Sequence, residues 1–132
     1  MTNHHFPKPA RLLRSSEFDQ VFAVRTSAAN DSLIVYGAEN TLGRPRLGLV
    51  VSRRYGPAVA RNRWKRVARE AFRTTQQDLP ALDLICLPRG DAAPDFAQMV
   101  ASLNDLAARI EEKLRKRRQR TPGEGGPRRT AP

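Results

Sequence analysis

The side chains best suited to chemistry in this 132-residue sequence are the cations of one segment, residues 51–73. Eight arginine or lysine residues stand there beside a single acid, Glu70. At about 100° per residue from Ala58, a helix places most of them within an arc of roughly 140°. The cationic arc holds Arg61, Asn62, Lys65, Arg66, Arg69 and Arg73, and the opposite side holds Ala60, Trp64, Val67, Ala68 and Ala71. One side can therefore pack on a core while the other binds a polyphosphate backbone.

An ordinary solvated helix face is the alternative interpretation of this segment. Such faces mix charge signs at i,i+4, which stabilises the helix. Here cations follow one another at that spacing: Arg61, Lys65, Arg69 and Arg73. The net charge of the chain, +11, adds self-repulsion that a polyanion offsets. Nucleic acid is the leading partner, an anionic membrane is the second, and a charged surface without any partner is the third.

The other reactive side chains support neither conventional catalysis nor a metal site on the protein. Cys86 lies in an apolar stretch with no histidine nearby in sequence, so we interpret it as a core residue rather than a nucleophile. His4 and His5 are adjacent and cannot converge on one metal ion. We favour structural roles for the three aspartates that could bind Mg²⁺ weakly: Asp83, Asp91 and Asp95. The sequence predicts no catalytic residue.

The pattern of apolar residues predicts three helices. Ser16 and Asp19 have the spacing of a capping box, so a short first helix is expected over 17–24. The basic helix follows Pro57, a residue that suits the first helical turn. Asp95 is the expected cap of a long last helix, whose apolar residues recur at helical intervals.

Runs of β-forming residues between turn residues predict strands at 33–38, 46–52 and 82–87. With the helices they give the order helix, two or three strands, helix, strand, helix, which is a single α+β domain over residues 1–114. From residue 115 the chain is rich in Arg, Gly and Pro, so we predict a basic disordered tail over 115–132. No apolar run approaches the ~20 residues of a membrane span, and no secretory signal is recognisable, which favours a cytoplasmic protein.

Three aromatic side chains near the basic helix have two open interpretations. Phe18 and Phe22 stand four residues apart on the first helix, and Tyr36 lies on a predicted strand. Core packing is their default role, yet aromatic rings beside a cationic surface also stack the bases of single-stranded nucleic acid. Spacing alone leaves core and groove equally open for Phe22. Trp64 lies on the apolar side of the basic helix and is interpreted as a core residue.

The segment from Arg61 to Arg73 closely resembles the RNR signature of the family of protein subunits of bacterial ribonuclease P. The resemblance covers about residues 6–114. Its other matching motifs are Phe6-Pro7-Lys8, Arg11-Leu12, Glu17-Phe18, Val21-Phe22, Arg46-Leu47-Gly48 and Val51-Ser52-Arg53-Arg54. The sequence departs from the family pattern at Arg53 and Arg54, where lysines are usual, and at Trp64, where an aliphatic residue is usual.

This resemblance implies a fold and a function. The fold is an α-β-β-β-α-β-α sandwich in which the basic helix lies in a left-handed β-α-β crossover, against the general preference for right-handed ones. The function is that of a ribonucleoprotein subunit, and the RNA of that particle removes the 5′ leader from precursor tRNA. The implied cofactor is Mg²⁺, bound mainly by the RNA subunit and the substrate. The implied partners are the catalytic RNA and precursor tRNA, with no membrane and no further protein required.

The resemblance also implies two sets of site residues. Binding of the RNA subunit is implied for Arg61, Asn62, Arg63, Lys65, Arg66, Arg69 and Arg73. A cleft for the leader, between the first helix, the sheet and the basic helix, is implied for Phe18, Phe22, Tyr36, Ser52 and Arg54. The alternatives are a structural, ribosome-associated RNA-binding protein and, more weakly, a helical DNA-binding regulator, which lacks a suitably spaced supporting helix.

Overall fold

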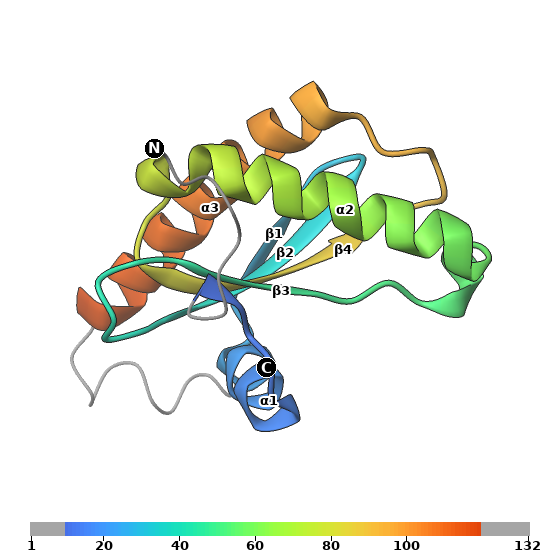
Figure 1. Ribbon diagram of the computed structural model, residues 1–132. Coiled ribbons are helices and arrows are strands. Elements are labelled where there is room, and N and C mark those ends of the chain that lie inside the picture. Colours follow the sequence, from blue (N-terminus) through green and yellow to red (C-terminus); the bar gives the residue numbers. More distant parts are fainter. Residues whose placement is uncertain (1–9, 120–132) are drawn as a thin grey trace.

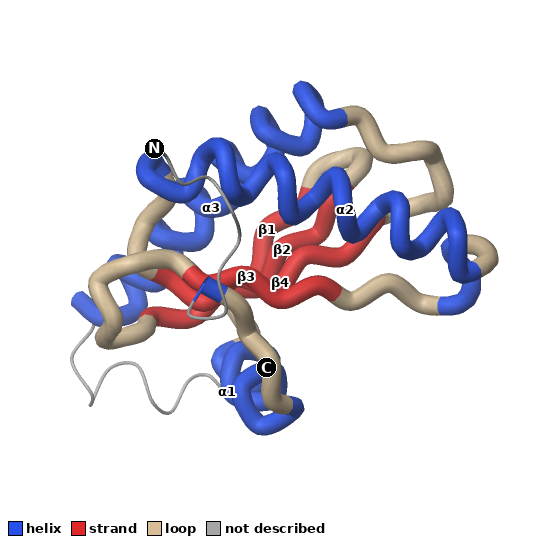
Figure 2. The backbone as a smooth tube through the Cα atoms, viewed as in Figure 1, coloured by secondary structure: helices blue, strands red, loops and turns tan. Residues whose placement is uncertain are grey.

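The computed structural model describes residues 10–119, which form three α-helices and a four-stranded sheet (Figures 1 and 2). The helices are α1 (Ser15–Val24), α2 (Ala58–Thr75) and α3 (Phe96–Gln119). The strands are β1 (Ser27–Ala29), β2 (Leu33–Glu39), β3 (Arg46–Leu49) and β4 (Leu82–Pro88). Short 3₁₀ helices flank α2: η2 (Arg53–Tyr55) and η3 (Gln76–Asp78). The order of elements confirms the predicted fold class.

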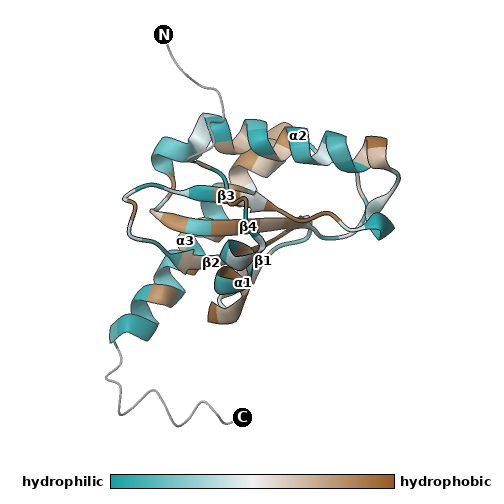
Figure 3. Ribbon diagram, turned by 60° about the horizontal axis from the view of Figure 1, so that its bottom comes forward, coloured by the Kyte–Doolittle hydropathy of each residue, from teal (hydrophilic) through white to brown (hydrophobic). Residues whose placement is uncertain are grey.

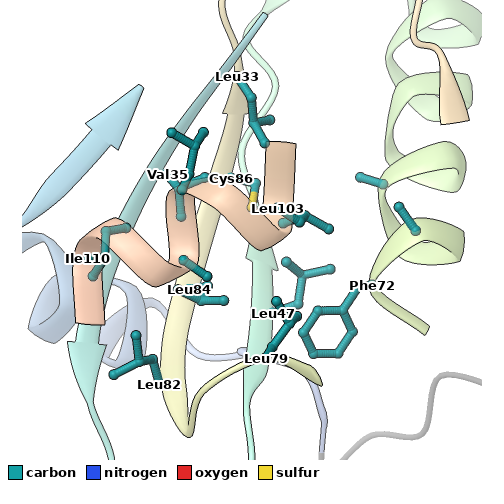
Figure 4. Packing of buried hydrophobic residues seen from close by; sticks show 14 of the residues in the cluster. Leu33, Val35, Leu47, Phe72, Leu79, Leu82, Leu84, Cys86, Leu103 and Ile110 are labelled. Carbon is teal, nitrogen blue, oxygen red and sulfur yellow. The ribbon is translucent and has the colours of Figure 1, made fainter. Parts of the chain in front are cut away.

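The sheet is mixed, with the strand order β1-β2-β4-β3. Strand β2 pairs antiparallel with β1 on one side and with β4 on the other. Strand β3 runs parallel to β4 and is joined to it through α2. Figure 4 shows the sheet behind α3, with Leu84 of β4 to the left of Leu47 of β3 and both strands running upward. Because α2 packs on this same near face, the β3-α2-β4 crossover is left-handed, as the resemblance implied.

Alternation along the strands gives the sheet two different faces. In β2, Leu33 and Val35 belong to the core beneath α2 and α3, whereas Tyr36 belongs to a smaller cluster beside α1. The larger core is fully enclosed, and Figure 4 shows its residues converging between the sheet and the two long helices. Its most buried members include Val35, Phe72, Leu84, Leu106 and Ile110, each 0% exposed.

The second face of the sheet is covered only in part. In the described part of the chain, α1 packs on this face, where Val21 and Ile85 are buried. Around them, Phe22, Tyr36 and Leu87 are only half-buried. This face therefore keeps apolar and aromatic side chains accessible to a ligand.

The expected capping of the first helix is wrong. Helix α1 begins at Ser15, two residues before the expected start, and the predicted capping box of Ser16 with Asp19 does not form. Instead Oε1 of Glu17 accepts hydrogen bonds from the backbone N–H groups of Leu13 and Arg14, at 2.8 and 3.0 Å. A single carboxylate thus satisfies two donors of the segment that enters the helix.

One predicted strand is shorter in the structure, and the hydropathy pattern does not predict β1. Strand β3 ends at Leu49 rather than at Ser52, because Ser52 already leads into the 3₁₀ turn η2. Strand β1 has three residues, which is too short for a periodic hydropathy signal. It forms by pairing with β2, where Ser27 lies opposite Tyr36.

The boundary predicted for the disordered tail is wrong by five residues. Helix α3 continues to Gln119, because its last turn has partners on other elements. Arg117 donates a hydrogen bond to the carbonyl oxygen of Val24, and Arg118 forms an ion pair with Glu39. The remainder of the predicted tail, 120–132, lies outside the described residues, as do the two adjacent histidines near the start of the chain.

Candidate nucleic-acid interface

The outer side of α2 is a continuous cationic surface. Figure 3 shows α2 along the top of the molecule with mostly hydrophilic residues outward. The opposite side is anchored, because Trp64 and Phe72 are 2% and 0% exposed. The interpretation of Trp64 as a core residue is confirmed. The residues that the resemblance assigned to the RNA subunit all lie on the exposed or half-buried part of this helix: Arg61, Asn62, Arg63, Lys65, Arg66, Arg69 and Arg73.

Within residues 10–119, most cations on this surface form no ion pair with an acid. Arg73 pairs with Glu70 one turn earlier. In the part of the chain that the structure describes, no ion pair forms at the cations of residues 61–69. Arg61 is held by a neutral group, since its Nη1 donates a hydrogen bond to the carbonyl oxygen of Gly56 at 3.2 Å. Repulsion between these like charges remains uncompensated, and a bound polyanion would relieve it.

A groove of about 390 Å³ lies between α1, β3 and α2. Phe18 lines it from α1, whereas Lys65 and Arg69 line it from α2. Gly48 lies in β3 between them, and a Cβ atom there would stand 2.7 Å from Cζ of Phe18. The missing side chain therefore lets the aromatic ring lie directly against the strand. An aromatic ring beside two cations can stack a base while the cations hold its phosphates.

A second pair of aromatic residues lies on the open face of the sheet. The rings of Phe22 and Tyr36 pack edge to face, with centroids 4.9 Å apart and an interplanar angle of 72°. This is a favourable geometry for two aromatic quadrupoles. Both side chains are half-buried, so they contribute to the smaller core and also keep part of their surface accessible.

Ser52 and Arg54 line a separate hollow of about 520 Å³. Both are exposed, and they share the hollow with the half-buried side chains of Val50 and Leu87. Tyr55 fixes this corner, since its hydroxyl donates a hydrogen bond of 2.8 Å to a carbonyl of the loop before α3. Burial raises the pKa of Tyr55, with the nearby acid of that loop acting in the same direction, so the hydroxyl remains a donor.

The predicted leader cleft is therefore a series of hollows rather than a single pocket. Phe18 shares its groove with the cations of α2, whereas Ser52 and Arg54 stand in the other hollow. Val50 and Leu87 connect them, because they line the second hollow and pack on the same small core as Phe18. Phe22 and Tyr36 pack on that core as well.

Sequence reasoning missed several residues that line these hollows. The sequence predicts Leu87 only as part of an apolar strand, and the structure places it on the same open face as Ile85. Residues 84–87 are apolar on both faces of the strand, so the hydropathy pattern does not show which of them face α1. Arg11 lines the groove because its segment forms a parallel bridge to Leu47 at the edge of β3. No local pattern predicts such a bridge.

A network of ions fixes α1 to the sheet and so positions Phe18. Arg46 binds Asp83 through two hydrogen bonds, from Nε at 2.9 Å and from Nη2 at 2.8 Å. Its Nη1 also binds Oε2 of Glu17 in α1 at 3.1 Å. The hydrogen bonds to Asp83, more than those to Glu17, raise the pKa of Arg46. The guanidinium thereby ties α1 to both β3 and β4.

The pKa of Glu17 is lowered by the same arrangement. Its largest cause is the hydrogen bond from the backbone N–H of Arg14, followed by that from Leu13. Burial acts in the opposite direction, and Arg46 adds a smaller lowering. The carboxylate is therefore stabilised in its charged form, which is the form that the network requires.

The remaining reactive residues have structural roles. Cys86 is 1% exposed, and burial raises the pKa of its thiol to about 12, so the thiol stays protonated and enclosed. Asp95 caps α3 as expected, since its Oδ1 accepts a hydrogen bond from the N–H of Gln98 at 2.9 Å. Among residues 10–119, no group of three or more His, Cys, Asp and Glu residues could hold a metal ion. None of the helices there is both long and apolar enough to span a bilayer.

A mixed sheet with a cationic helix on one side and accessible aromatic rings on the other defines a small α+β RNA-binding protein. The sequence model of the family described as Ribonuclease P matches residues 6–111. The chain belongs to this family, and its function is that of the protein subunit of ribonuclease P.

Two ribonuclease P protein components are similar in sequence to almost the whole chain. The ribonuclease P protein component of Marinobacter nauticus is 42% identical over 130 residues, which cover 95% of this chain and 96% of that protein. The corresponding protein of Chromohalobacter salexigens is 39% identical over 119 residues, which cover 88% and 93% of the two chains.

Solved structures show the same fold. The RNase P protein of Staphylococcus aureus is 30% identical with a TM-score of 0.66, covering 78% of this chain and 95% of its own. The RNase P protein of Thermotoga maritima is also 30% identical, with a TM-score of 0.65, covering 72% of this chain and 96% of its own.

Proposed function

We propose that the cationic surface of α2 binds the catalytic RNA of ribonuclease P. The observation that carries this proposal is the series of cations over residues 61–69, which has no ion pair with any acid of residues 10–119 although the helix that carries it is firmly anchored. An anchored helix presents its cations at fixed intervals, so their contacts with phosphates can set the position and orientation of the bound RNA. The ribosome-associated alternative is not favoured, because the family is that of ribonuclease P.

The open face of the sheet binds the 5′ leader of precursor tRNA. Support comes from its accessible rings, which can stack unpaired bases without regard to sequence. Arg54 adds a cation and Ser52 a hydroxyl at the far end of this face. The groove at Phe18 adjoins α2, so leader and catalytic RNA would meet there.

The protein contributes binding and orientation, and the RNA supplies the chemistry of leader removal. Mg²⁺ is bound mainly by the RNA subunit and the substrate, whose phosphate oxygens are the hard ligands that this ion prefers. The cations of α2 lower the repulsion between the two RNAs, which allows them to approach each other. The proposal places the particle in the cytoplasm, with no membrane and no further protein.

Reconstitution tests this function. The purified protein should cleave nothing alone, and with catalytic RNA transcribed from the same source it should release the 5′ leader at low Mg²⁺ concentration. Cleavage by protein rigorously freed of RNA would contradict the proposal. So would reconstituted particles that bind precursor and mature tRNA equally well.

A double variant tests the role of α2. Arg66→Gln with Arg69→Gln should weaken binding of the catalytic RNA and lower the slope of log K against log salt by roughly 1.5, at about 0.7–0.9 per lost phosphate contact. Arg109→Gln with Arg115→Gln removes the same charge from cations that pair with acids on α3, and serves as the control. If the two double variants had equal affinity and equal salt slope, the RNA subunit would not bind at this surface.

A further inference from the structure

A second group of cations lies where α1 turns into β1. It comprises Arg25, Lys113, Lys116 and Arg117, which we call the α3-end patch; all four are exposed. Figure 3 shows α2 along the top of the molecule and the C-terminal end of α3 at its lower left, beyond the sheet. The patch is therefore separate from the surface assigned to the catalytic RNA.

Neutral groups hold two of these cations in place. Nη1 of Arg117 donates a hydrogen bond to the carbonyl oxygen of Val24 at 2.8 Å, and it also contacts the hydroxyl of Thr26. Nζ of Lys113 donates to the carbonyl oxygen of Ser27. These hydrogen bonds fix both side chains. Because carbonyl and hydroxyl oxygens carry no net charge, they leave the positive charges of the two side chains uncompensated.

The other cations of α3 are paired with acids. Arg109 pairs with Asp105, Arg115 with Glu112, and Arg118 with Glu39. Within residues 10–119, no ion pair forms at any member of the α3-end patch. The cations of α3 outside the patch are thus neutralised by acids. The α3-end patch keeps its positive charge, and it faces the α1–β1 turn. Such a concentration of like charge favours a polyanionic partner.

The patch adjoins the aromatic pair of the open face. Arg25 ends α1 three residues after Phe22, and Lys113 binds Ser27, which lies opposite Tyr36 in the sheet. A strand stacked on Phe22 and Tyr36 therefore reaches these cations next. Since the patch lies away from α2, where the catalytic RNA is placed, this part of the strand is the part farther from the cleavage site.

We propose that the α3-end patch binds phosphates of the 5′ leader beyond the nucleotides held by the aromatic residues. The inference rests on the proposed leader site and extends it to longer leaders. Contacts of this kind carry no sequence preference, because cations read the backbone and not the bases. They should make affinity depend on leader length.

Hydrogen bonds hold Lys113 and Arg117, so a double variant of the other two members of the patch tests this inference. Arg25→Asn with Lys116→Gln removes two charges, and asparagine tolerates the left-handed backbone at position 25, where φ is 59°. The control is again Arg109→Gln with Arg115→Gln, which removes two charges from the same helix outside the patch. Each protein is reconstituted with the catalytic RNA, and its affinity is measured for precursor tRNAs whose leaders are lengthened one nucleotide at a time.

Wild type and control should gain affinity as the leader grows past the aromatic cleft, and the double variant should lose that gain. We expect a loss of about three- to tenfold for long leaders and a fall of roughly 1.4 in the salt slope, at about 0.7 per single-strand contact. Leaders too short to pass the cleft should bind all three particles equally.

Two results would overturn the inference while the proposed function stands. The double variant could match the control at every leader length, which would leave the patch without an RNA contact. It could instead bind every substrate more weakly by one factor, mature tRNA included, which would assign the patch to the RNA subunit or to the tRNA body. If wild type gained no affinity from any leader, the leader site itself would be wrong, and the inference with it.

Discussion

The two faces of the sheet use the same strands for different purposes. On the face beneath α2 and α3, Val35 and Leu84 are 0% exposed, and the core is closed. On the face beside α1, Tyr36 and Leu87 alternate with them along β2 and β4 and remain half-buried. Alternation therefore lets one strand supply stability through one set of side chains and binding surface through the other.

Helix length explains why the second face stays open. Helices α2 and α3 have 18 and 24 residues, whereas α1 has 10 and is only about 15 Å long. A helix this short covers the face around Ala38 and Ile85, and it leaves the pair Ile34 and Leu87, at the start of β2 and the end of β4, only half-buried. The network around Arg46 compensates by fixing α1 with ionic contacts where apolar contact area is small.

The largest expected effect concerns the covered face. Phe72→Ala should lower the free energy of unfolding by about 3–5 kcal/mol, because it leaves a cavity in an enclosed core. Urea denaturation measures this loss. Phe22→Ala serves as the comparison on the open face and should cost clearly less, since its ring is only half-buried. Equal losses for the two variants would abolish the distinction between the faces.

For RNA binding the order should be reversed, and Phe22→Ala should have a larger effect than Phe72→Ala. Loss of one stacking ring is expected to weaken leader binding by about 1–3 kcal/mol, which is roughly 5- to 150-fold. Affinity of the holoenzyme for precursor tRNA, set against its affinity for mature tRNA, isolates this contribution. Phe22→Tyr keeps the ring and should retain most of the binding. An equal loss for precursor and mature tRNA would show that Phe22 does not contact the leader.

Sequence reasoning predicted α2 well because its signal is local. The helical period alone places Trp64 and Ala68 on the buried side and Arg66 and Arg69 on the exposed side, and no distant partner is needed to see it. The grouping of the cleft residues could not be predicted in this way. It depends on β4 lying between β2 and β3, which places Leu87 opposite Ile34 although they are far apart in the sequence.

The capping of α1 was missed for a related reason. Ser16 and Asp19 have suitable spacing, yet the helix begins at Ser15, so Glu17 stands at the third helical position and accepts the backbone hydrogen bonds. Arg46, distant in sequence, also binds its carboxylate. Spacing rules describe what a helix start can do alone. Here the start of the helix decides which residue caps it, and a tertiary ion pair adds to that cap.

The smallest expected effect concerns pH and the attachment of α1. Because the pKa of Glu17 is lowered in the folded protein, its carboxylate adds stability that is present above the ordinary value of 4.5 and is lost as the pH falls through the lowered value. Glu17→Gln removes this titration but keeps an oxygen that can accept the hydrogen bonds of Leu13 and Arg14. The difference in unfolding free energy between wild type and variant should therefore be constant near neutral pH and should shrink below about pH 4.5.

Urea denaturation across this pH range measures the difference, and the fluorescence of Trp64 can follow unfolding because this residue is buried beneath α2. The effect should be small, since the Glu17 side chain is 26% exposed and solvent screens its pairing with Arg46. Leader affinity gives a second measure, because Glu17 helps fix the helix that carries Phe18. A difference in unfolding free energy that stays constant through acid pH would mean that the backbone contacts of position 17, and not its charge, hold α1 on the open face.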